Sequence, residues 1–418
     1  MYFNEVAVSL SNRMRVQVDE AGRIALPSEV GTRLGLTEGA EFLLEETPHA
    51  LTLRRVHVQP AKIYIEPTSR CNLACRMCIH NAWEEPQGTM SEAIFARLME
   101  GIEALPEKPL IVFGGFGEPL FHPKIREMVR RAKAAASHVE LITNGILFTE
   151  DLAREFIRLG VDRVWFSLDR LHADAYADGA NPIQNIEKLN YLRYVHNASL
   201  PETGIVFVAA RSNLSELPSL LRVASRYGIS HYMMTNVLPY SAEMCEEALY
   251  TRALDAMESQ PSMWSPSLQL LRMDWNEDTL MPLYQTLRAR HNVQINGARL
   301  NPAEGRCPFI ETGAVAVSWD GSVSPCLGLM HSHVSYLYDK PRAVSRYVVG
   351  NVNDAALSEI WNNADHLAFR QRVHEFDFSP CTLCGGCDMA EANLEDCFGN
   401  TFPTCGGCLW AWGVIQCP

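Results

Sequence analysis

The sequence predicts an α/β protein built on a parallel sheet, with a small β-rich module before it and a cysteine-rich segment after it. Six apolar runs alternate with amphipathic segments between residues 63 and 239, as is typical of parallel strands joined by crossover helices. Of the 13 cysteines, 12 gather near the start of this region and beyond residue 300. This distribution separates a regular domain from a segment that we expect to bind metal.

The expected strands are residues 63–67, 110–115, 139–145, 163–169, 204–211 and 231–239. Apolar residues recur with helical spacing in the intervening segments, and helices are expected over 91–105, 124–136 and 214–228. The carboxyl ends of parallel strands meet at one edge of a sheet, so we expect the chemistry of this domain there.

The flanking segments have different patterns. Residues 14–55 indicate a β-rich module, in which Val16 and Val18 lie on a first short strand. From about residue 300 the regular alternation stops and Cys, Gly and Pro dominate, with one helix expected over 356–373. Such a segment needs bound metal because its own apolar core is thin. The predicted domains are residues 1–58, 59–299 and 300–418.

Charge and composition exclude several classes of protein. The 418 residues include 36 basic and 49 acidic side chains, and the net charge of −13 argues against a chain that coats nucleic acid. No apolar run approaches the roughly 20 residues of a membrane helix, and the N-terminus shows no secretory pattern. We therefore expect a cytoplasmic protein without a membrane partner. Since a cytosol keeps thiols reduced, the closely spaced cysteines indicate metal ligands rather than disulfides.

The first cysteine group lies directly after the first expected strand. Cys71, Cys75 and Cys78 have the spacing Cys-x3-Cys-x2-Cys. Three thiolates cannot close a four-ligand site, but they can hold a four-iron cluster with one iron left open. The alternatives are a zinc site completed by His80 or a distant residue, and a structural thiol cluster.

This loop resembles the cluster loop of the radical S-adenosylmethionine (SAM) superfamily. The resemblance continues along residues 60–240: GGFGEP follows the second strand, ITNG ends the third and SLD ends the fourth. It implies a partial (β/α)6 barrel of radical SAM type, a four-iron cluster and SAM. The SAM-binding residues that it implies are Gly114, Gly115, Phe116, Gly117, Glu118, Asn144, Ser167 and Asp169.

The resemblance also implies a chemistry. The reduced cluster gives an electron to the SAM sulfonium, which leaves methionine and a 5′-deoxyadenosyl radical, and the radical takes a hydrogen atom from the substrate. In such enzymes the cofactor performs the difficult step, while the protein positions the substrate and excludes water. The sequence does not identify a catalytic side chain.

The C-terminal cysteines resemble the SPASM extension of radical SAM enzymes, which holds two auxiliary four-iron clusters. The opening half, from Cys307 to Cys326, fits the SPASM spacing closely. The later half, from Cys381 onward, departs from the usual Cys-x2-Cys-x5-Cys-x3-Cys run. The candidate ligands are Cys307, Cys326, Cys381, Cys384, Cys387, Cys397, Cys405, Cys408 and Cys417. Two full clusters need eight thiolates, so at least one of the nine is spare, and zinc ribbons are the alternative. Cys245 stands alone and is expected to be a buried, small apolar side chain.

Residues 14–55 resemble the swapped-hairpin domain of AbrB-type transcription factors, with GRIALP as the matching core. In that family the module is an intertwined dimer whose arginines contact DNA, and the candidates here are Arg13, Arg15, Arg23 and Arg33. The acidity of the chain favours a homodimer, or docking of a protein substrate, over DNA binding.

Taken with TNVLPYSAEM (235–244) and the ending CGGCLWAWGVIQCP, this module makes the chain most similar to the tungsten-cofactor oxidoreductase maturases. The resemblance implies a maturase that acts on a protein, peptide or cofactor, linked to a tungsten-containing aldehyde ferredoxin oxidoreductase. A ferredoxin or flavodoxin is the expected electron donor. The alternatives are a thioether- or carbon-crosslinking peptide maturase and an iron–sulfur DNA-binding redox sensor.

Overall fold

The computed structural model divides the chain into two compact units, Met1–Val58 and Gln59–Pro418. The described residues are 20, 23–24, 42–47, 50–55, 57–83, 85–169, 182–229, 231–251, 273–274, 276, 278–279, 281–282, 285, 306–382 and 387–417.

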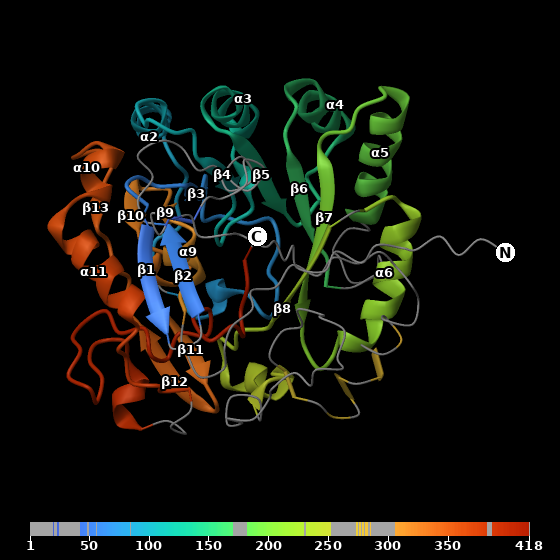
Figure 1. Cartoon of the computed structure of the whole chain (residues 1–418). Coiled ribbons are helices and arrows are strands. Elements are labelled where there is room, and N and C mark those ends of the chain that lie inside the picture. The colour runs from blue at the N-terminus through green and yellow to red at the C-terminus, as the bar shows by residue number, and fades with distance from the viewer. Residues whose placement is uncertain are drawn as a thin grey trace. The chain divides into compact units, whose positions relative to one another are not determined.

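The second unit is built on one nine-stranded sheet, in the order β13-β10-β9-β3-β4-β5-β6-β7-β8 (Figure 1). From β3 to β8, each strand pairs in parallel with its neighbour, which confirms the parallel α/β prediction. The six strands are β3 Lys62–Ile65, β4 Leu110–Phe113, β5 His138–Thr143, β6 Arg163–Ser167, β7 Glu202–Ala209 and β8 His231–Asn236. Because all six strands run parallel, their carboxyl ends lie at the same edge of the sheet.

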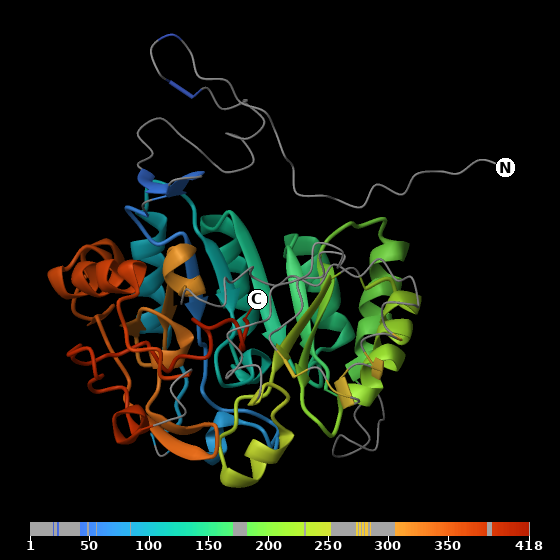
Figure 2. The same ribbon diagram turned by 60° about the horizontal axis from the view of Figure 1, so that its bottom comes forward.

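Helices connect these strands, and Figures 1 and 2 show α2 to α5 along one face of the sheet. Their hydroxyl caps explain where two of them begin: Ser91 accepts a hydrogen bond from the Ile94 N–H (3.2 Å), and Thr149 accepts one from Leu152 (3.3 Å). The helices are α2 Glu92–Glu103, α3 Ile125–Ala135, α4 Glu150–Leu159, α5 Pro182–Val195 and α6 Leu217–Arg226.

The main core lies between these helices and the sheet. Leu98, Val129 and Phe156 of the helices are fully buried in one apolar cluster with Ile63 and Phe113 of the strands. Burying a side chain of this size contributes about 1.5–3 kcal/mol. This core holds the strands in place, so the loops at their carboxyl ends start from fixed positions.

The chain beyond residue 306 is more regular than the sequence predicts. Strand β9 (Ala314–Val317) pairs in parallel with β3 and extends the sheet. Strands β10 (Ser322–Ser324) and β13 (Gly350–Asn351) then add to it in antiparallel orientation. The sequence did not predict that this segment adds strands to the sheet, because a four-residue run such as AVAV is too short to predict a strand.

The rest of this region contains a hairpin and two helices. Strands β11 (His333–Leu337) and β12 (Lys340–Val344) pair in antiparallel orientation. The helix expected over 356–373 is broken into α10 (Leu357–Trp361) and α11 (Ala364–Glu375), because the Asn363 side chain accepts a hydrogen bond from the His366 N–H (2.7 Å) and caps the second helix. Short helical turns are α9 Pro308–Glu311, η1 Ile79–Asn81, η2 Pro119–Phe121, η5 Leu214–Glu216, η6 Ala242–Glu247, η7 Leu327–Leu329 and η8 Asp388–Glu391.

The first unit contains one described hairpin, formed by β1 (Phe42–Thr47) and β2 (Ala50–Arg55). Both strands lie within the predicted β-rich module, residues 14–55. The expected strand with Val16 and Val18 lies outside the described residues, as do Arg13, Arg15 and Arg33.

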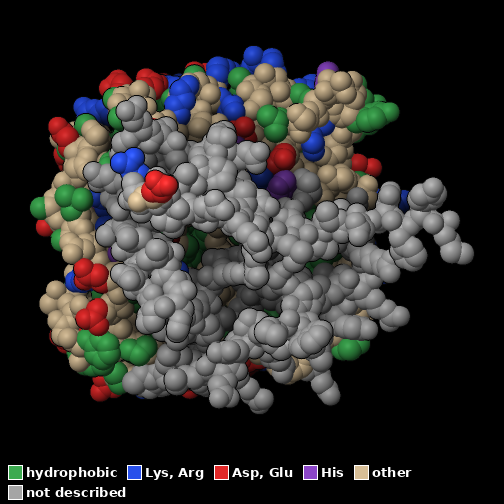
Figure 3. Space-filling view, viewed as in Figure 1, with side chains coloured by type: hydrophobic (Ala, Val, Ile, Leu, Met, Phe, Trp, Pro, Cys, Tyr) green, Lys and Arg blue, Asp and Glu red, His purple; other side chains and the backbone are tan. Residues whose placement is uncertain are grey.

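No helix in the described part of the chain is long and apolar enough to cross a membrane. Side chains of both charges lie side by side above the sheet in Figure 3, over the outer helices. Arg130 of α3 is 2.8 Å from Glu155 of α4, and Arg131 is 3.1 Å from Glu103 of α2. These arginines are therefore paired with carboxylates rather than free to bind phosphate.

Candidate active site and cluster-binding residues

The loop after β3 brings the three expected thiols to the carboxyl edge of the sheet. The Leu73 N–H donates to the Cys71 sulfur (3.4 Å), and the Cys78 N–H donates to the Cys75 carbonyl (3.1 Å), which folds the loop back on itself. All three cysteines are free thiols. Burial raises the pKa of each, and the neighbouring Cys78, Asp169 and Cys71 help to raise that of Cys75 to about 11. Three thiolates this close repel one another, and bound iron relieves that repulsion.

The glycine-rich turn after β4 packs directly against this loop. A side chain at Gly117 would place its Cβ 2.0 Å from the Thr68 carbonyl oxygen, and one at Gly115 (φ +114°) would meet the Glu66 side chain at 2.9 Å. Only glycine allows this approach. The Phe116 N–H donates to Glu66 (3.0 Å), which fixes the turn 114–118 above the end of β3.

Glu118 ties the same turn to the end of β5. Its carboxylate accepts hydrogen bonds from the Thr143 hydroxyl (2.8 Å), the Asn144 N–H (2.7 Å) and the Leu120 N–H (2.9 Å). Burial raises the pKa of Glu118 to about 6, although these hydrogen bonds act in the opposite direction. The Asn144 side chain in turn reaches the Cys71 sulfur at 3.9 Å.

The remaining expected SAM-binding residues lie at the end of β6. Ser167 is the last residue of that strand and is half-buried. Asp169 follows two residues later and accepts a hydrogen bond from the Val208 N–H of β7 (3.0 Å). The turn 114–118, Asn144, Ser167 and Asp169 thus lie at the carboxyl ends of three neighbouring strands, at the edge where the thiols lie.

One buried network at this edge has no signal in the sequence. The imidazole of His331 contacts Glu66 through Nε2 (2.9 Å) and Glu85 through Nδ1 (2.8 Å), and its ring stacks on Trp83 at 4.3 Å. Burial alone would lower the pKa of His331, but its contacts with Glu66 and Glu85 outweigh that effect and raise it. The partners lie 265 and 246 positions away in sequence, so no motif could reveal them.

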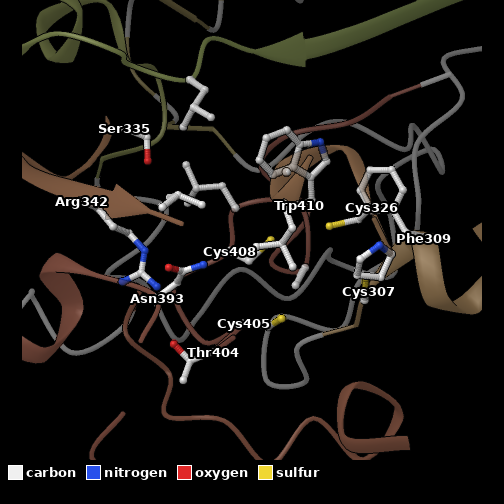
Figure 4. A pocket seen from close by; sticks show the side chains of 18 of the residues that line it. Cys307, Phe309, Cys326, Ser335, Arg342, Asn393, Thr404, Cys405, Cys408 and Trp410 are labelled. Atoms are coloured by element: carbon white, nitrogen blue, oxygen red, sulfur yellow. The ribbon is translucent and has the colours of Figure 1, made fainter. Parts of the chain in front are cut away.

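Four C-terminal thiols surround one pocket (Figure 4). Its empty volume is about 810 Å³, including space open to solvent, and its lining includes Cys307, Cys326, Cys405 and Cys408. Burial raises the pKa of Cys307 to about 12, with a further contribution from Cys408. The pKa of Cys326 is also well above its usual range because of burial and the proximity of the other three thiols. This donor set fits a four-iron cluster.

A second C-terminal group forms around Ser379. The Cys397 sulfur lies 3.0 Å and the Cys381 sulfur 3.8 Å from the Ser379 hydroxyl oxygen. Burial raises the pKa of Cys381, and the nearby thiol of Cys387 raises it further. Cys384 lies outside the described residues.

The last two cysteines have different surroundings. The Cys417 sulfur accepts a hydrogen bond from the Trp410 indole N–H (3.2 Å). Cys245 is half-buried, so the expectation of a buried apolar side chain is wrong for this thiol, which donates to the Ser241 carbonyl at 3.7 Å.

The zinc alternatives concern single-ion sites. Among the described residues, no three His, Cys, Asp or Glu side chains form a group that could hold a metal ion. One ion requires thiolate sulfurs within about 4 Å of one another, whereas the thiolates around a four-iron cubane stand farther apart. His80, the proposed fourth zinc ligand, packs against Trp83 with ring centroids 4.8 Å apart. Its buried Nε2 has no hydrogen-bond partner among the described residues.

Comparison with known proteins places this geometry in a family. The radical SAM superfamily profile matches residues 65–238, and the SPASM profile, an iron-sulfur cluster-binding domain, matches 307–388. A tungsten-containing aldehyde ferredoxin oxidoreductase cofactor-modifying protein from Pyrococcus furiosus is 30% identical over 85% of this chain and 96% of its own length. The chain belongs to the radical SAM superfamily. It is a radical SAM enzyme with a SPASM domain, and its cofactors are SAM, a SAM-binding four-iron cluster and auxiliary clusters.

Other similar proteins are more distant in sequence. A PqqA peptide cyclase from Gluconobacter oxydans is 24% identical, over 83% of this chain and 90% of its own length. Among solved structures, anSMEcpe with bound AdoMet has a TM-score of 0.51 at 18% identity, covering 85% of this chain and 93% of its own. Streptococcus suis SuiB bound to S-adenosylmethionine also has a TM-score of 0.51, at 14% identity, with 80% and 72% coverage. These two structures support the fold.

Proposed function

We propose that this radical SAM enzyme is a maturase that modifies a protein, peptide or cofactor during maturation of a tungsten-containing aldehyde ferredoxin oxidoreductase. The observation that carries this proposal is the 30% identity to the Pyrococcus furiosus cofactor-modifying protein over 96% of that protein's length. Peptide crosslinking is the second candidate, and the 24% identity to PqqA peptide cyclase supports it less strongly.

In this proposal Cys71, Cys75 and Cys78 hold the SAM-binding cluster. When bound, that cluster supplies the electron that cleaves SAM to methionine and a 5′-deoxyadenosyl radical. Backbone groups of the turn 114–118 then hold the methionyl part of SAM, because the glycines let it approach the main chain. Asn144, Ser167 and Asp169 offer polar groups to the ribose hydroxyls.

The C-terminal thiols divide into two sets of four in the same proposal. The first set lines the pocket, and two members of the second, Cys381 and Cys397, contact Ser379. Cys417 is then the ninth, spare thiol. The two sets are Cys307, Cys326, Cys405 and Cys408, and Cys381, Cys384, Cys387 and Cys397.

Three further features complete the proposal. The enzyme acts in the cytoplasm with ferredoxin or flavodoxin as electron donor. The AbrB-like module, residues 1–58, makes it a homodimer and helps to dock the substrate. DNA binding by this module is the competing role.

The test replaces Cys71, Cys75 and Cys78 together with Ala. We expect 5′-deoxyadenosine formation under dithionite to fall to background, because no thiolate remains to hold the iron that reduces SAM. Iron content should fall by about four atoms per chain, with the auxiliary clusters retained. Wild-type rates of 5′-deoxyadenosine formation in this variant would refute the assignment. Loss of cleavage also separates an enzyme from a cluster-bearing sensor, which has no need to cleave SAM.

A further inference from the structure

The segment around His331 connects the C-terminal pocket to the SAM-binding turn. Cys326 lines the pocket, the short turn Leu327–Leu329 follows it, and His331 comes next. Glu66, which contacts the His331 ring, also accepts the Phe116 N–H of the turn. A continuous path of chain and hydrogen bonds therefore leads from one site to the other.

Both ring nitrogens of His331 face carboxylates. A neutral imidazole can donate from only one nitrogen, so donation to both Glu66 and Glu85 requires the protonated ring, which the raised pKa of His331 favours. Arg346 lies 3.9 Å from Glu85 and 3.5 Å from Asp320, so it is shared between these two carboxylates. Removing the ring would leave the buried Glu66 without its cationic partner, which is costly in a site of low dielectric constant.

The same segment is joined to the loop that follows the cluster cysteines. The Val334 N–H donates to the Ala82 carbonyl (3.1 Å), and the Ser332 N–H donates to Glu85 (2.7 Å). Trp83, which lies between Ala82 and Glu85 in sequence, stacks on the His331 ring. Residues 332–334, directly after His331, are thus tied to residues 82–85, while the His331 ring itself contacts Glu66 and Glu85.

We propose that His331 is a positioning residue. It links the binding of an auxiliary cluster in the pocket lined by Cys326 to the binding of SAM by residues 114–118. A cluster at the pocket holds Cys326, the segment that follows keeps His331 in place, and His331 keeps Glu66 beneath the turn. By reciprocity, SAM binding stabilises the 327–334 segment. The inference rests on the proposal that the turn binds SAM.

The test compares His331→Gln with a matched control, His138→Gln. His138 lies at the start of β5, at the opposite edge of the sheet, and also faces two carboxylates, Glu140 (2.9 Å) and Asp162 (3.5 Å). In anaerobically reconstituted protein we expect His331→Gln to weaken SAM binding about tenfold, a typical size for coupling between sites. Iron content should stay at the wild-type level, and His138→Gln should bind SAM as the wild type does.

Hydrogen exchange gives a readout that does not depend on activity. SAM should slow amide exchange in residues 327–337 of the wild type and of His138→Gln, but not of His331→Gln. Equal SAM affinity in all three proteins, or no protection of 327–337 by SAM, would overturn the inference while leaving the proposed function intact. A wild type that binds no SAM would overturn both.

Discussion

At the scale of single residues, Glu118 shows how burial sets the chemistry of this site. Its side chain accepts three hydrogen bonds and connects the turn after β4 to the end of β5. Even so, burial raises the pKa of its carboxyl group to about 6 from 4.5. The folded protein therefore holds the Glu118 proton more tightly than the unfolded chain does.

This difference predicts a pH dependence of stability. A raised folded-state pKa means that the contribution of Glu118 is fully present below pH 4.5 and is lost as the pH rises through about 6. Glu118→Gln has no proton to lose. The unfolding temperature of the wild type minus that of Glu118→Gln should therefore fall between about pH 5 and pH 7 and then stay constant. A difference that rises with pH over this range would contradict the prediction.

The sequence predicted local motifs better than distant partners. Cys71, Cys75 and Cys78 stand close together in sequence, and the polar residues at strand ends can be placed once the strands are known. Their carboxyl-edge location follows from parallel pairing alone. His331 could not be predicted, because its contact with Glu66 depends on how the segment after β10 folds back onto the barrel.

At the scale of elements, the parallel sheet was predictable because each of its central strands is a distinct apolar run between amphipathic helices. Strand β9 was missed because it has four residues and pairs with β3, far away in sequence. That pairing matters for function, since it attaches the cysteine-rich segment to the strand that leads into the cluster loop.

The β1–β2 hairpin predicts an oligomeric state. A two-stranded sheet is marginally stable alone and leaves strand edges unpaired, and pairing with a second copy would cover them. Because identical chains usually associate with twofold symmetry, we expect a homodimer. Deleting residues 1–58 should convert the dimer to a monomer in light scattering, while 5′-deoxyadenosine formation without substrate survives. A full-length monomer at micromolar concentration would refute this, and sequence-selective retention of a DNA duplex at physiological salt would favour the DNA-binding role.

At the scale of the whole molecule, the barrel and the C-terminal region form one compact unit that contains three groups of thiols. Arg342 lies near both C-terminal groups of thiols. It lines the pocket, and its positive charge lowers the pKa of Cys381, against the larger raising effect of burial. Its guanidinium also donates to the Ala390 carbonyl. A buried cation between two groups of thiolates lowers the cost of holding their negative charge in the interior.

This arrangement predicts how iron is distributed among the cysteines. Three four-iron clusters correspond to about 12 irons per chain. Replacing Cys405 and Cys408 together with Ala removes two of the four thiols that line the pocket, so the iron content should fall to about eight. Cys417→Ala is the matched control, because its thiol accepts the Trp410 N–H and belongs to neither set of four; it should retain about 12 irons. Iron and zinc analysis after anaerobic reconstitution measures both variants. Loss of a cluster in Cys417→Ala would make this thiol a ligand, and stoichiometric zinc in place of C-terminal iron would refute the auxiliary clusters themselves.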